Sequence, residues 1–365
     1  MTAPPFSGAL GADTPPGYRS GFVALIGRPN VGKSTLLNQL VGEKVAITSP
    51  VAQTTRNRLR AILTTPQAQL VLLDTPGIHK PHHLLGQRLV QSARGAIGEV
   101  DVVLLLVDGS QPAGRGDAFI VDLLRHGRVP VHIALNKCDQ VDPARAEELA
   151  ASYRELLVTR PAPASDGWPP RPEPSPEAQG SPDQPAAGSA AWSAAVPPES
   201  GSDPDPDSGQ GNEPWPLHPL SALTGEGCTE LVSALAADLP LGPHLYPADA
   251  ISDQPEQLLL AELIREQVLH QTREEVPHSV AVQIDRIVDD GPRTAVLATV
   301  LVERSSQKGI LIGKGGQMLR EIGRGARLQM QKVFDGPVYL ELFVKVVPGW
   351  RSHPGRLSEL GYRGD

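Results

Sequence analysis

Short, continuously apolar runs alternate with amphipathic stretches from residue 21 to residue 240. The apolar runs cover residues 22–26, 69–73, 102–107 and 131–135, with a further short strand expected at residues 217–223. Strands of a parallel sheet are buried on both faces and therefore appear as continuous apolar runs. The stretches between them predict helices that begin at Ser34 and that cover residues 113–125, 142–157 and 229–239. This alternation predicts an α/β fold with a doubly wound, mostly parallel sheet.

The pattern changes after residue 254. A helix is expected at residues 255–272, alternating strands at 279–288 and 294–302, a helix at 317–334 and a strand at 338–347. Gly313-Lys314-Gly315-Gly316 lies before the last helix, directly after the apolar residues 310–312. The order helix, strand, strand, helix, helix, strand, with Gly-x-x-Gly between the last two helices, is typical of a type II KH domain, an α+β domain that binds RNA.

The tetrapeptide alone is weak evidence, because residues 8–11, 95–98 and 361–364 also match Gly-x-x-Gly. The apolar residues before the tetrapeptide, the lysine inside it and the basic helix after it strengthen the prediction of an RNA-binding KH domain. The glycines would let the backbone approach nucleic-acid phosphates, with the bases in an apolar groove beside them. The candidate RNA-binding residues are Ile312, Gly313, Lys314, Gly315, Gly316, Arg320, Arg324 and Arg327.

One eight-residue stretch connects the first apolar run to the first predicted helix. It reads Gly27-Arg28-Pro29-Asn30-Val31-Gly32-Lys33-Ser34 and matches the phosphate-binding loop pattern. Its glycines let the backbone present N–H groups to a polyphosphate, and the helix that follows faces the anion with its N-terminus. Lys33 would pair with the β- and γ-phosphates, and the Ser34 hydroxyl would be a ligand of Mg²⁺. We predict that all eight residues contact a nucleotide.

A second strand end supplies further candidates for magnesium and γ-phosphate binding. The apolar run at 69–73 leads into Asp74-Thr75-Pro76-Gly77. Asp74 would hold Mg²⁺ through water, and the Gly77 N–H would sense the γ-phosphate. The polar stretch at residues 45–56 lies where P-loop GTPases keep their first switch; we choose Thr55 as its magnesium ligand, with Thr54 as the alternative. The candidate catalytic residues are Lys33, Thr55 and Gly77.

The choice of base is predicted from the end of the run at residues 131–135, which continues as Asn136-Lys137-Cys138-Asp139. The Asp139 carboxylate would accept two N–H bonds, from guanine N1 and N2, which adenine does not offer. Asn136 is expected to brace this loop, and the Lys137 stem to pack over the base. Ser221-Ala222-Leu223 would present backbone N–H groups to guanine O6. The predicted ligand is therefore GTP, and Asp139 disfavours an ATP-using kinase.

Composition narrows the cellular context. The chain has 365 residues and two cysteines, which favours a reducing compartment and argues against a disulfide framework or a cysteine zinc site. No apolar run approaches the length of a membrane-spanning helix, about 18 residues or more. Residues 1–20 lack the charged-then-apolar order of a signal peptide. We therefore expect a cytoplasmic protein.

The net charge of −8 is unevenly distributed. Residues 159–216 contain nine acids, two bases and fifteen prolines, and this composition predicts a disordered insertion. Residues 304–351 contain nine Lys or Arg and three acids, so the predicted RNA-binding region is basic. We divide the chain into a disordered leader (1–20), a GTPase domain (21–240) with the disordered insertion at about 159–216, a linker (241–254), a KH domain (255–350) and a C-terminal tail (351–365).

The nucleotide motifs followed by a KH domain resemble the Era family of bacterial GTPases, within the TrmE-Era-EngA-like group. Gln53-Thr54-Thr55-Arg56, Pro277-His278-Ser279-Val280 and Leu360-Gly361-Tyr362 agree as well, and the resemblance covers residues 21–362 apart from the insertion. It implies a role in assembly of the small ribosomal subunit, with the KH domain on the 3′ end of its ribosomal RNA and the GTP state controlling engagement. Peripheral association with the inner face of the cell membrane is also implied. We expect a monomer.

One departure from signalling GTPases concerns the residue after Gly77. Those enzymes carry a water-positioning Gln there, whereas this chain has Ile78, so intrinsic hydrolysis is expected to be slow. In the wider group that the chain resembles, an Asn at the position of Asn30 helps to hold a potassium ion, and Asn30 is our candidate ligand for K⁺. An RNA chaperone whose nucleotide site is mainly structural remains the alternative to a GTPase switch.

Overall fold

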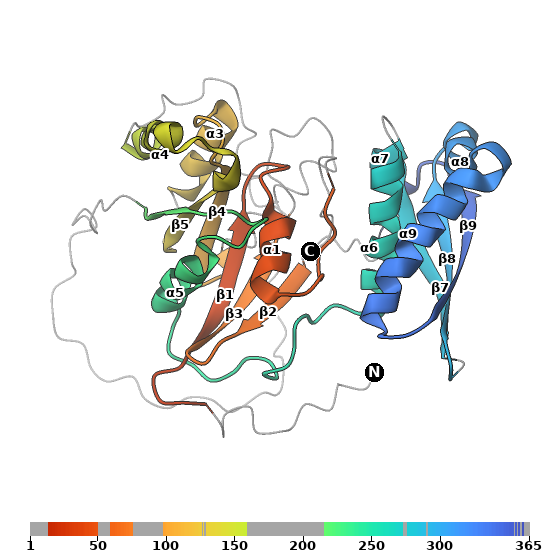
Figure 1. Cartoon of the computed structure of the whole chain (residues 1–365), viewed down its shortest axis with the longest axis horizontal. Helices are drawn as coiled ribbons and strands as arrows, with labels where there is room; N and C mark the ends of the chain where they lie inside the picture. Colours follow the sequence, from red (N-terminus) through yellow and green to blue (C-terminus); the bar gives the residue numbers. More distant parts are fainter. Residues whose placement is uncertain are drawn as a thin grey trace, which may run out of the picture.

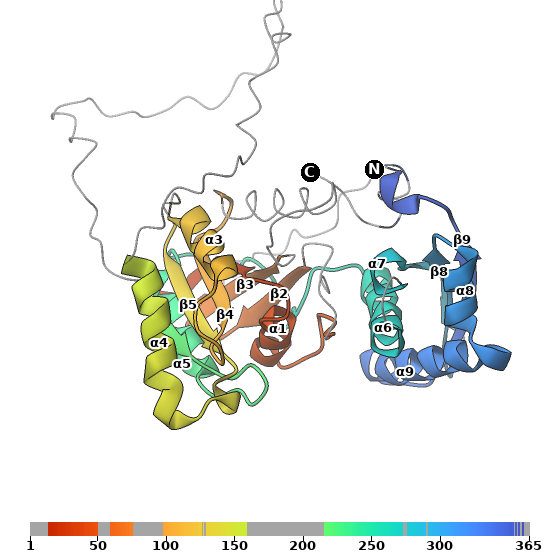
Figure 2. The same cartoon turned by 90° about the horizontal axis from the view of Figure 1, so that it is seen from above.

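The computed structural model describes residues 14–49, 59–75, 98–125, 127, 129–158, 215–272, 276–289, 291–353, 355, 357 and 360. Its elements form two groups that lie side by side, each built around its own sheet (Figure 1, Figure 2). The predicted leader up to residue 13 and the predicted insertion up to residue 214 lie outside the described residues.

The larger group contains a six-stranded sheet in the order β2-β3-β1-β4-β5-β6. Its strands are β1 (Arg19–Ile26), β2 (Leu59–Thr64), β3 (Ala68–Asp74), β4 (Val102–Asp108), β5 (Val131–Asn136) and β6 (Leu217–Pro219). All neighbouring strands are parallel except β2 and β3, which confirms the predicted α/β class. β3 and β4 pair with opposite edges of β1, so the carboxyl end of β1 lies at the switch point where open α/β sheets bind ligands.

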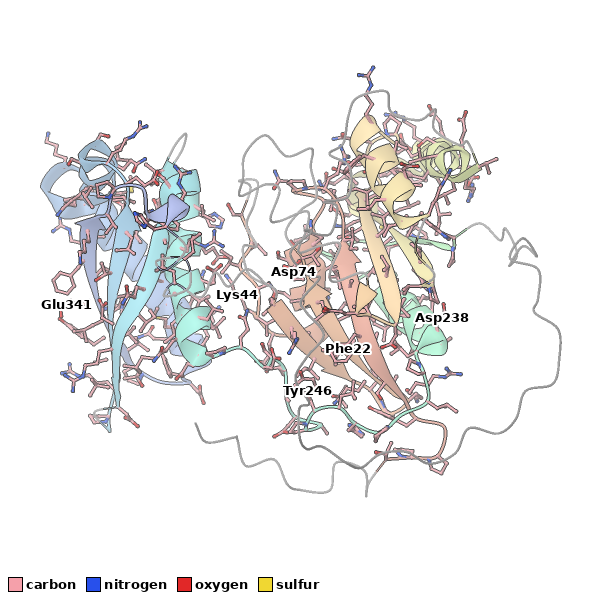
Figure 3. All side chains as sticks on the ribbon, turned by 180° about the vertical axis from the view of Figure 1, so that it is seen from behind. Phe22, Lys44, Asp74, Asp238, Tyr246 and Glu341 are labelled. Atoms are coloured by element: carbon pink, nitrogen blue, oxygen red, sulfur yellow. The ribbon has the colours of Figure 1, made fainter. Side chains whose placement is uncertain are left out.

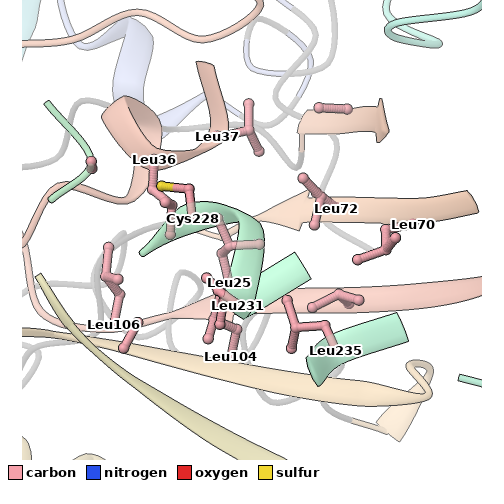
Figure 4. Packing of buried hydrophobic residues seen from close by; sticks show 14 of the residues in the cluster. Leu25, Leu36, Leu37, Leu70, Leu72, Leu104, Leu106, Cys228, Leu231 and Leu235 are labelled. Carbon is pink, nitrogen blue, oxygen red and sulfur yellow. The ribbon is translucent and has the colours of Figure 1, made fainter. Parts of the chain in front are cut away.

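Helices cover both faces of this sheet. The helices α1 (Lys33–Val41) and α5 (Cys228–Asp238) bury leucines against one face, as Figure 4 shows for Leu36, Leu231 and Leu235. On the other face, α3 (Arg115–Leu124) contributes Ile120 and α4 (Pro143–Val158) contributes Tyr153 to a second core. Because both faces are covered, β3 and β4 are buried along their whole length, as their uninterrupted apolar sequence predicts.

The strand β2 was not predicted from the hydrophobic pattern. It returns antiparallel to β3 through a turn in which the Thr65 N–H donates to the Ala68 carbonyl oxygen at 2.8 Å. The segment that leaves α5 then follows the free edge of β2: the Ile62 N–H donates to the Ile251 carbonyl oxygen at 2.9 Å. The side chain of Gln69 accepts the N–H groups of Leu245 and Tyr246 from the same segment. Residues of the predicted linker are thus hydrogen-bonded to the sheet.

The second group is an α+β domain. It contains α6 (Glu256–Gln271), α7 (Val276–Ser279), β7 (Ala281–Asp289), β8 (Thr294–Val302), α8 (Ser305–Ile312), α9 (Gln317–Val333) and β9 (Val338–Val346). The sheet order is β7-β8-β9; β7 and β8 are antiparallel, and β8 and β9 are parallel. One sheet face packs with α6, α8 and α9 in a common apolar core. The parallel pair is connected by α8, the turn Lys314–Gly316 and α9, which is the predicted KH arrangement.

Candidate functional site

The phosphate-binding loop connects the carboxyl end of β1 to the N-terminus of α1. Gly32 has φ +101°, and a Cβ there would lie 2.3 Å from Nδ2 of Asn136, so a larger residue would be both strained and obstructed. Asn30 also has a positive φ, of 63°, which Asn tolerates better than most residues. The loop is therefore curled tightly between β1, α1 and the end of β5.

Lys33 lies inside this loop. Its ammonium Nζ donates to the carbonyl oxygens of Gly27 at 3.0 Å and Arg28 at 2.9 Å, and only 7% of the residue is exposed. Burial lowers the pKa of Lys33 to about 8, with the charge of Asp74 acting in the opposite direction. A polyphosphate would bring negative charge beside this ammonium group and would raise its pKa again.

The two predicted magnesium ligands that the structure describes lie together. The Ser34 hydroxyl donates to Asp74 Oδ2 at 3.1 Å, and Asp74 is fully buried. Thr75 donates its hydroxyl to the Leu25 carbonyl oxygen at 2.7 Å, which fixes this strand end against β1. Hydroxyl and carboxylate oxygens suit Mg²⁺, which is usually held by one or two protein ligands together with phosphates and waters. The described residues contain no group of three His, Cys, Asp or Glu that could hold a metal ion.

The base-recognition loops are joined by the carboxamide of Asn136, which is 3% exposed. Its Nδ2 donates to the Val31 carbonyl oxygen at 2.8 Å, and its Oδ1 accepts the Ala222 N–H at 2.8 Å. Asp139 accepts a hydrogen bond of 2.6 Å from the Ser221 hydroxyl, which orients its carboxylate. Leu223 is exposed beside them. The three motifs that the sequence singled out therefore meet at one end of the sheet.

Sequence reasoning missed Asp108, the last residue of β4. Lys137 Nζ lies 2.7 Å from its Oδ2, and Lys137 itself has a left-handed backbone (φ 69°). Burial acts to raise the pKa of Asp108, but hydrogen bonds from Lys137 and Ser110 and the charge of Lys137 outweigh it, so the pKa is lowered. A signal was present in the sequence: Asp108 ends an apolar run, as Asp74 does.

A second missed residue is Asp117, in the first turn of α3. It is 1% exposed and lies 2.9 Å from Arg28 Nε, while its other oxygen accepts the Gly114 N–H at 3.0 Å. The guanidinium of Arg28 is therefore directed to α3, although the residue belongs to the phosphate-binding loop. No sequence pattern distinguished Asp117 from other helix-start acids.

Several predicted residues lie outside the described part of the chain. They are Thr54, Thr55, Pro76, Gly77 and Ile78. Their assignments to magnesium, to the γ-phosphate and to the position beside the attacking water stay predictions.

The predicted RNA-binding residues surround the turn between α8 and α9. Gly313 closely approaches α9, because a Cβ there would lie 2.7 Å from the Met318 Cβ. Lys314 and Gly315 are exposed at the tip, and Arg320 donates to the Gly315 carbonyl oxygen at 3.0 Å. Along α9, Arg324 and Arg327 are also exposed. Backbone and cationic groups are thus presented together, with Ile312 and Gly316 at intermediate exposure.

The two domains touch through Lys44 and the first residues of the stretch predicted to be the first switch. Glu266 of α6 is 1% exposed; its Oε2 lies 2.6 Å from Lys44 Nζ, and its Oε1 accepts the Thr48 N–H at 2.8 Å. His270 Nε2 lies 2.9 Å from the Thr48 carbonyl oxygen, and Ile47 packs into the core of the KH domain. Lys44 is labelled at this junction in Figure 3.

Comparisons with protein families agree with both parts of this description. The model of the 50S ribosome-binding GTPase family matches residues 22–137, and the KH domain model matches residues 275–351. The GTPase Era of Synechocystis sp. is 50% identical over 349 residues, which cover 96% of this chain and 94% of that protein. The GTPase Era of Nostoc sp. is also 50% identical over 349 residues, covering 96% of this chain and 91% of that protein.

Two solved structures resemble the whole chain. One is a variant of Era from Aquifex aeolicus bound to GDP and AlF4−; the other is Era in complex with MgGDPNP and nucleotides 1506–1542 of 16S ribosomal RNA. Each is 34% identical to this chain, covers 94% of it and 99% of the solved chain, and superposes with a TM-score of 0.74.

Proposed function

The chain belongs to the Era family of GTPases, and we propose that it is a GTP-hydrolysing switch that binds small-subunit ribosomal RNA near its 3′ end and assists assembly of the small ribosomal subunit. The observation that carries the proposal is that one chain combines two sites. Asp139, oriented by Ser221, lies at the guanine end of a phosphate-binding loop, and a basic Gly-x-x-Gly turn lies on the second domain. A 34% identical Era was crystallised with both magnesium nucleotide and 16S ribosomal RNA.

Within the nucleotide site we propose the following roles. The backbone of residues 27–34 and the Lys33 ammonium bind the phosphates, and Asn136, Lys137, Asp139 and residues 221–223 bind guanine. Ser34 and Asp74 hold Mg²⁺, together with Thr55 from the first switch. When bound, the metal supplies positive charge that stabilises the transferring phosphoryl group. Lys33, Thr55 and the Gly77 N–H act on the γ-phosphate in hydrolysis.

We propose that the contact at Glu266 couples the two sites. Thr48 and Lys44 are bonded to Glu266, and the predicted ligand Thr55 lies seven positions after Thr48 in the sequence. A movement of Thr55 onto magnesium would pull on Thr48 and weaken the bonds to a carboxylate that is almost completely buried. Since an unpaired buried carboxylate is costly, the position of α6 would respond to the nucleotide.

The proposed switch is tested by measuring RNA affinity in two nucleotide states. RNA of nucleotides 1506–1542 is expected to bind about fivefold or more tightly with a non-hydrolysable GTP analogue than with GDP, since allosteric coupling typically amounts to about 1–3 kcal/mol. Glu266→Gln is expected to bring the ratio towards one. The matched control is Glu256→Gln, an exposed residue of the same helix, which should leave the ratio unchanged. Equal affinities in both states for the unmutated protein would favour the RNA chaperone alternative.

We further propose that Asn30 contributes to a potassium site between the β- and γ-phosphates. Ile78 cannot orient water, so hydrolysis needs another source of positive charge where charge develops. The Asn30 carboxamide offers a neutral oxygen, and its left-handed backbone places it in the turn of the phosphate-binding loop. The alternative role for Asn30 is a hydrogen bond within its own turn, which is common for Asn. In that case the rate of hydrolysis would not depend on potassium.

Hydrolysis is expected to be about ten- to a hundredfold faster in potassium than in sodium at equal ionic strength, because a positioned cation would lower the barrier by about 1–3 kcal/mol. Asn30→Ala should erase the difference while magnesium-dependent GTP binding stays intact. Asn30→Gly serves as the control for backbone strain, since Gly adopts the φ of 63° without cost. Equal single-turnover rates of the unmutated protein in the two salts would contradict the potassium site.

The last part of the proposal concerns where in the cell the protein acts. No helix among the described residues is long and apolar enough to span a membrane. We place the protein in the cytoplasm, as a monomer. Peripheral association with the inner face of the cell membrane is a separate proposal that rests on the family resemblance alone.

A further inference from the structure

Two exposed aromatic side chains lie on the same strand of the KH domain. Tyr339 is 47% exposed and Phe343 is 51% exposed, and every other Phe, Tyr or Trp among the described residues is more deeply buried. Aromatic residues make up just 4% of the chain. Burying an aromatic ring on binding removes a large apolar area from water. Two exposed rings on one strand therefore make this face a candidate surface for binding a ligand that can cover them.

Both rings project from the sheet face that the helices leave uncovered. Leu340, Leu342 and Val344 of β9 pack into the core with the helices, so the alternate residues of β9 point to the opposite face. Figure 3 shows the molecule from this side and labels Glu341, which lies between Tyr339 and Phe343 in the sequence of β9. The two residues are four positions apart, which separates their Cα atoms by about 13 Å along the strand.

Neighbouring residues of β8 and β7 widen this surface. Tyr339 is paired with Ala295, Glu341 with Leu297 and Phe343 with Thr299. At one end the face is closed, because Trp350 and Leu357 pack over Ala281 and Leu301. The remaining open part, which we call the ring face, consists of residues from three strands: Tyr339, Glu341, Phe343, Ala295, Leu297, Thr299, Gln283, Asp285 and Arg286. The Thr299 hydroxyl donates to the Asp285 carboxylate at 2.6 Å.

The ring face shares its edge strand with the proposed RNA surface. β9 is the last strand of the sheet, and on the helix side it packs against α8 and α9, which flank the Gly-x-x-Gly turn. We propose that a single-stranded segment of the RNA bound at this turn continues around β9 and stacks bases on Tyr339 and Phe343. The inference rests on the proposed RNA-binding function and adds a second contact surface to it.

The charged groups on and around the ring face can accommodate RNA whose bases face the sheet and whose phosphates point away from it. The Arg293 guanidinium lies 5.7 Å from the centre of the Tyr339 ring, and Lys345 is exposed at the other end of the row. Exposed aromatic rings on an open sheet stack RNA bases in other single-strand-binding domains, with cations on the backbone. Glu341 lies between the rings, where its carboxylate would repel phosphate but accept hydrogen bonds from base amino groups. This arrangement favours a base with an amino group, that is guanine, cytosine or adenine, over uracil at the central position.

The test compares RNAs of different length on matched variants. RNA of nucleotides 1506–1542 and two shorter forms, truncated from the 5′ or the 3′ side, are titrated at fixed salt against the full chain. Tyr339→Thr with Phe343→Thr removes both rings but keeps residues suited to a strand. Base–aromatic stacking contributes about 1–3 kcal/mol per base, so the double variant is expected to bind the full-length RNA about tenfold or more weakly and to bind one truncated RNA as the unmutated protein does.

Two controls separate stacking from general effects. Tyr339→Phe with Phe343→Tyr keeps both rings and should keep the affinity, while Val158→Thr with Leu241→Thr removes exposed apolar groups elsewhere and should have no effect. Equal affinity of the double-threonine variant and the unmutated protein for every RNA would overturn the ring face as an RNA surface. Failure of the unmutated protein to bind any of these RNAs would instead overturn the proposed function, and the ring face with it.

Discussion

Asp139→Asn is expected to weaken GTP binding about 30- to 150-fold and to shift the preferred base from guanine towards xanthine. The Asp139 carboxylate is oriented by the Ser221 hydroxyl at 2.6 Å, so it is preset to accept the two N–H groups of guanine. Replacing it by an amide removes charge-assisted hydrogen bonds, at a cost of about 2–3 kcal/mol. Xanthine carries a carbonyl where guanine carries its amino group, so the amide of the variant can donate to it. Titration with fluorescent GTP and xanthosine triphosphate analogues measures both effects.

The matched control is Asp142→Asn, three residues further along the same loop. Asp142 is exposed and accepts the Ala144 N–H at 3.0 Å, outside the site. It therefore undergoes the same chemical change without facing the base, and its nucleotide affinities should stay those of the unmutated protein. Unchanged GTP affinity in Asp139→Asn would show that residues 136–139 are not the guanine loop.

Much of the nucleotide site was predictable because its motifs are local. Residues 27–34 are fixed by a strand, a turn and a helix that are consecutive in the sequence, and Asp74 and Asn136 each end an apolar strand. In a parallel sheet these carboxyl ends lie at one edge. The structure brings Ser34 to Asp74 and Asn136 to Val31 accordingly.

The contacts that the sequence did not reveal join polar residues far apart in the chain. Lys137 and Asp108 are separated by 29 positions, and Lys44 and Glu266 by 222. Many acids in the sequence could serve as partners, and only tertiary packing selects which one is buried beside the cation. β2 was missed for a related reason: its exposed Arg60 interrupts the apolar pattern, and its stability depends on pairing with β3 and the 251–253 segment.

In the turn of the KH domain, too, the sequence predicted the motif but not the tertiary contacts of its residues. The glycines at 313, 315 and 316 were recognisable, but the sequence could not say which of them is needed for packing. In the structure a Cβ at Gly313 would meet Met318, whereas a Cβ at Gly315 would meet nothing within 4 Å. Gly313 therefore has a role in the fold itself, and Gly315 is available for contact with a ligand.

Lys314→Asp combined with Gly315→Asp is expected to weaken RNA binding roughly a hundredfold or more while GTP binding stays unchanged. Both positions are exposed at the tip of the turn, and Gly315 has open space around it but a φ of +60°, so the substitution there adds backbone strain that the control has to match. Two carboxylates would face the phosphates, and the side chain at 315 would hold the RNA backbone away from the turn. The control is Arg145→Asp with Gly349→Asp, which changes the net charge equally and whose glycine also has a positive φ and open space. RNA affinity equal to that of the control, in filter binding at fixed salt, would mean that the Gly-x-x-Gly turn is not the RNA site.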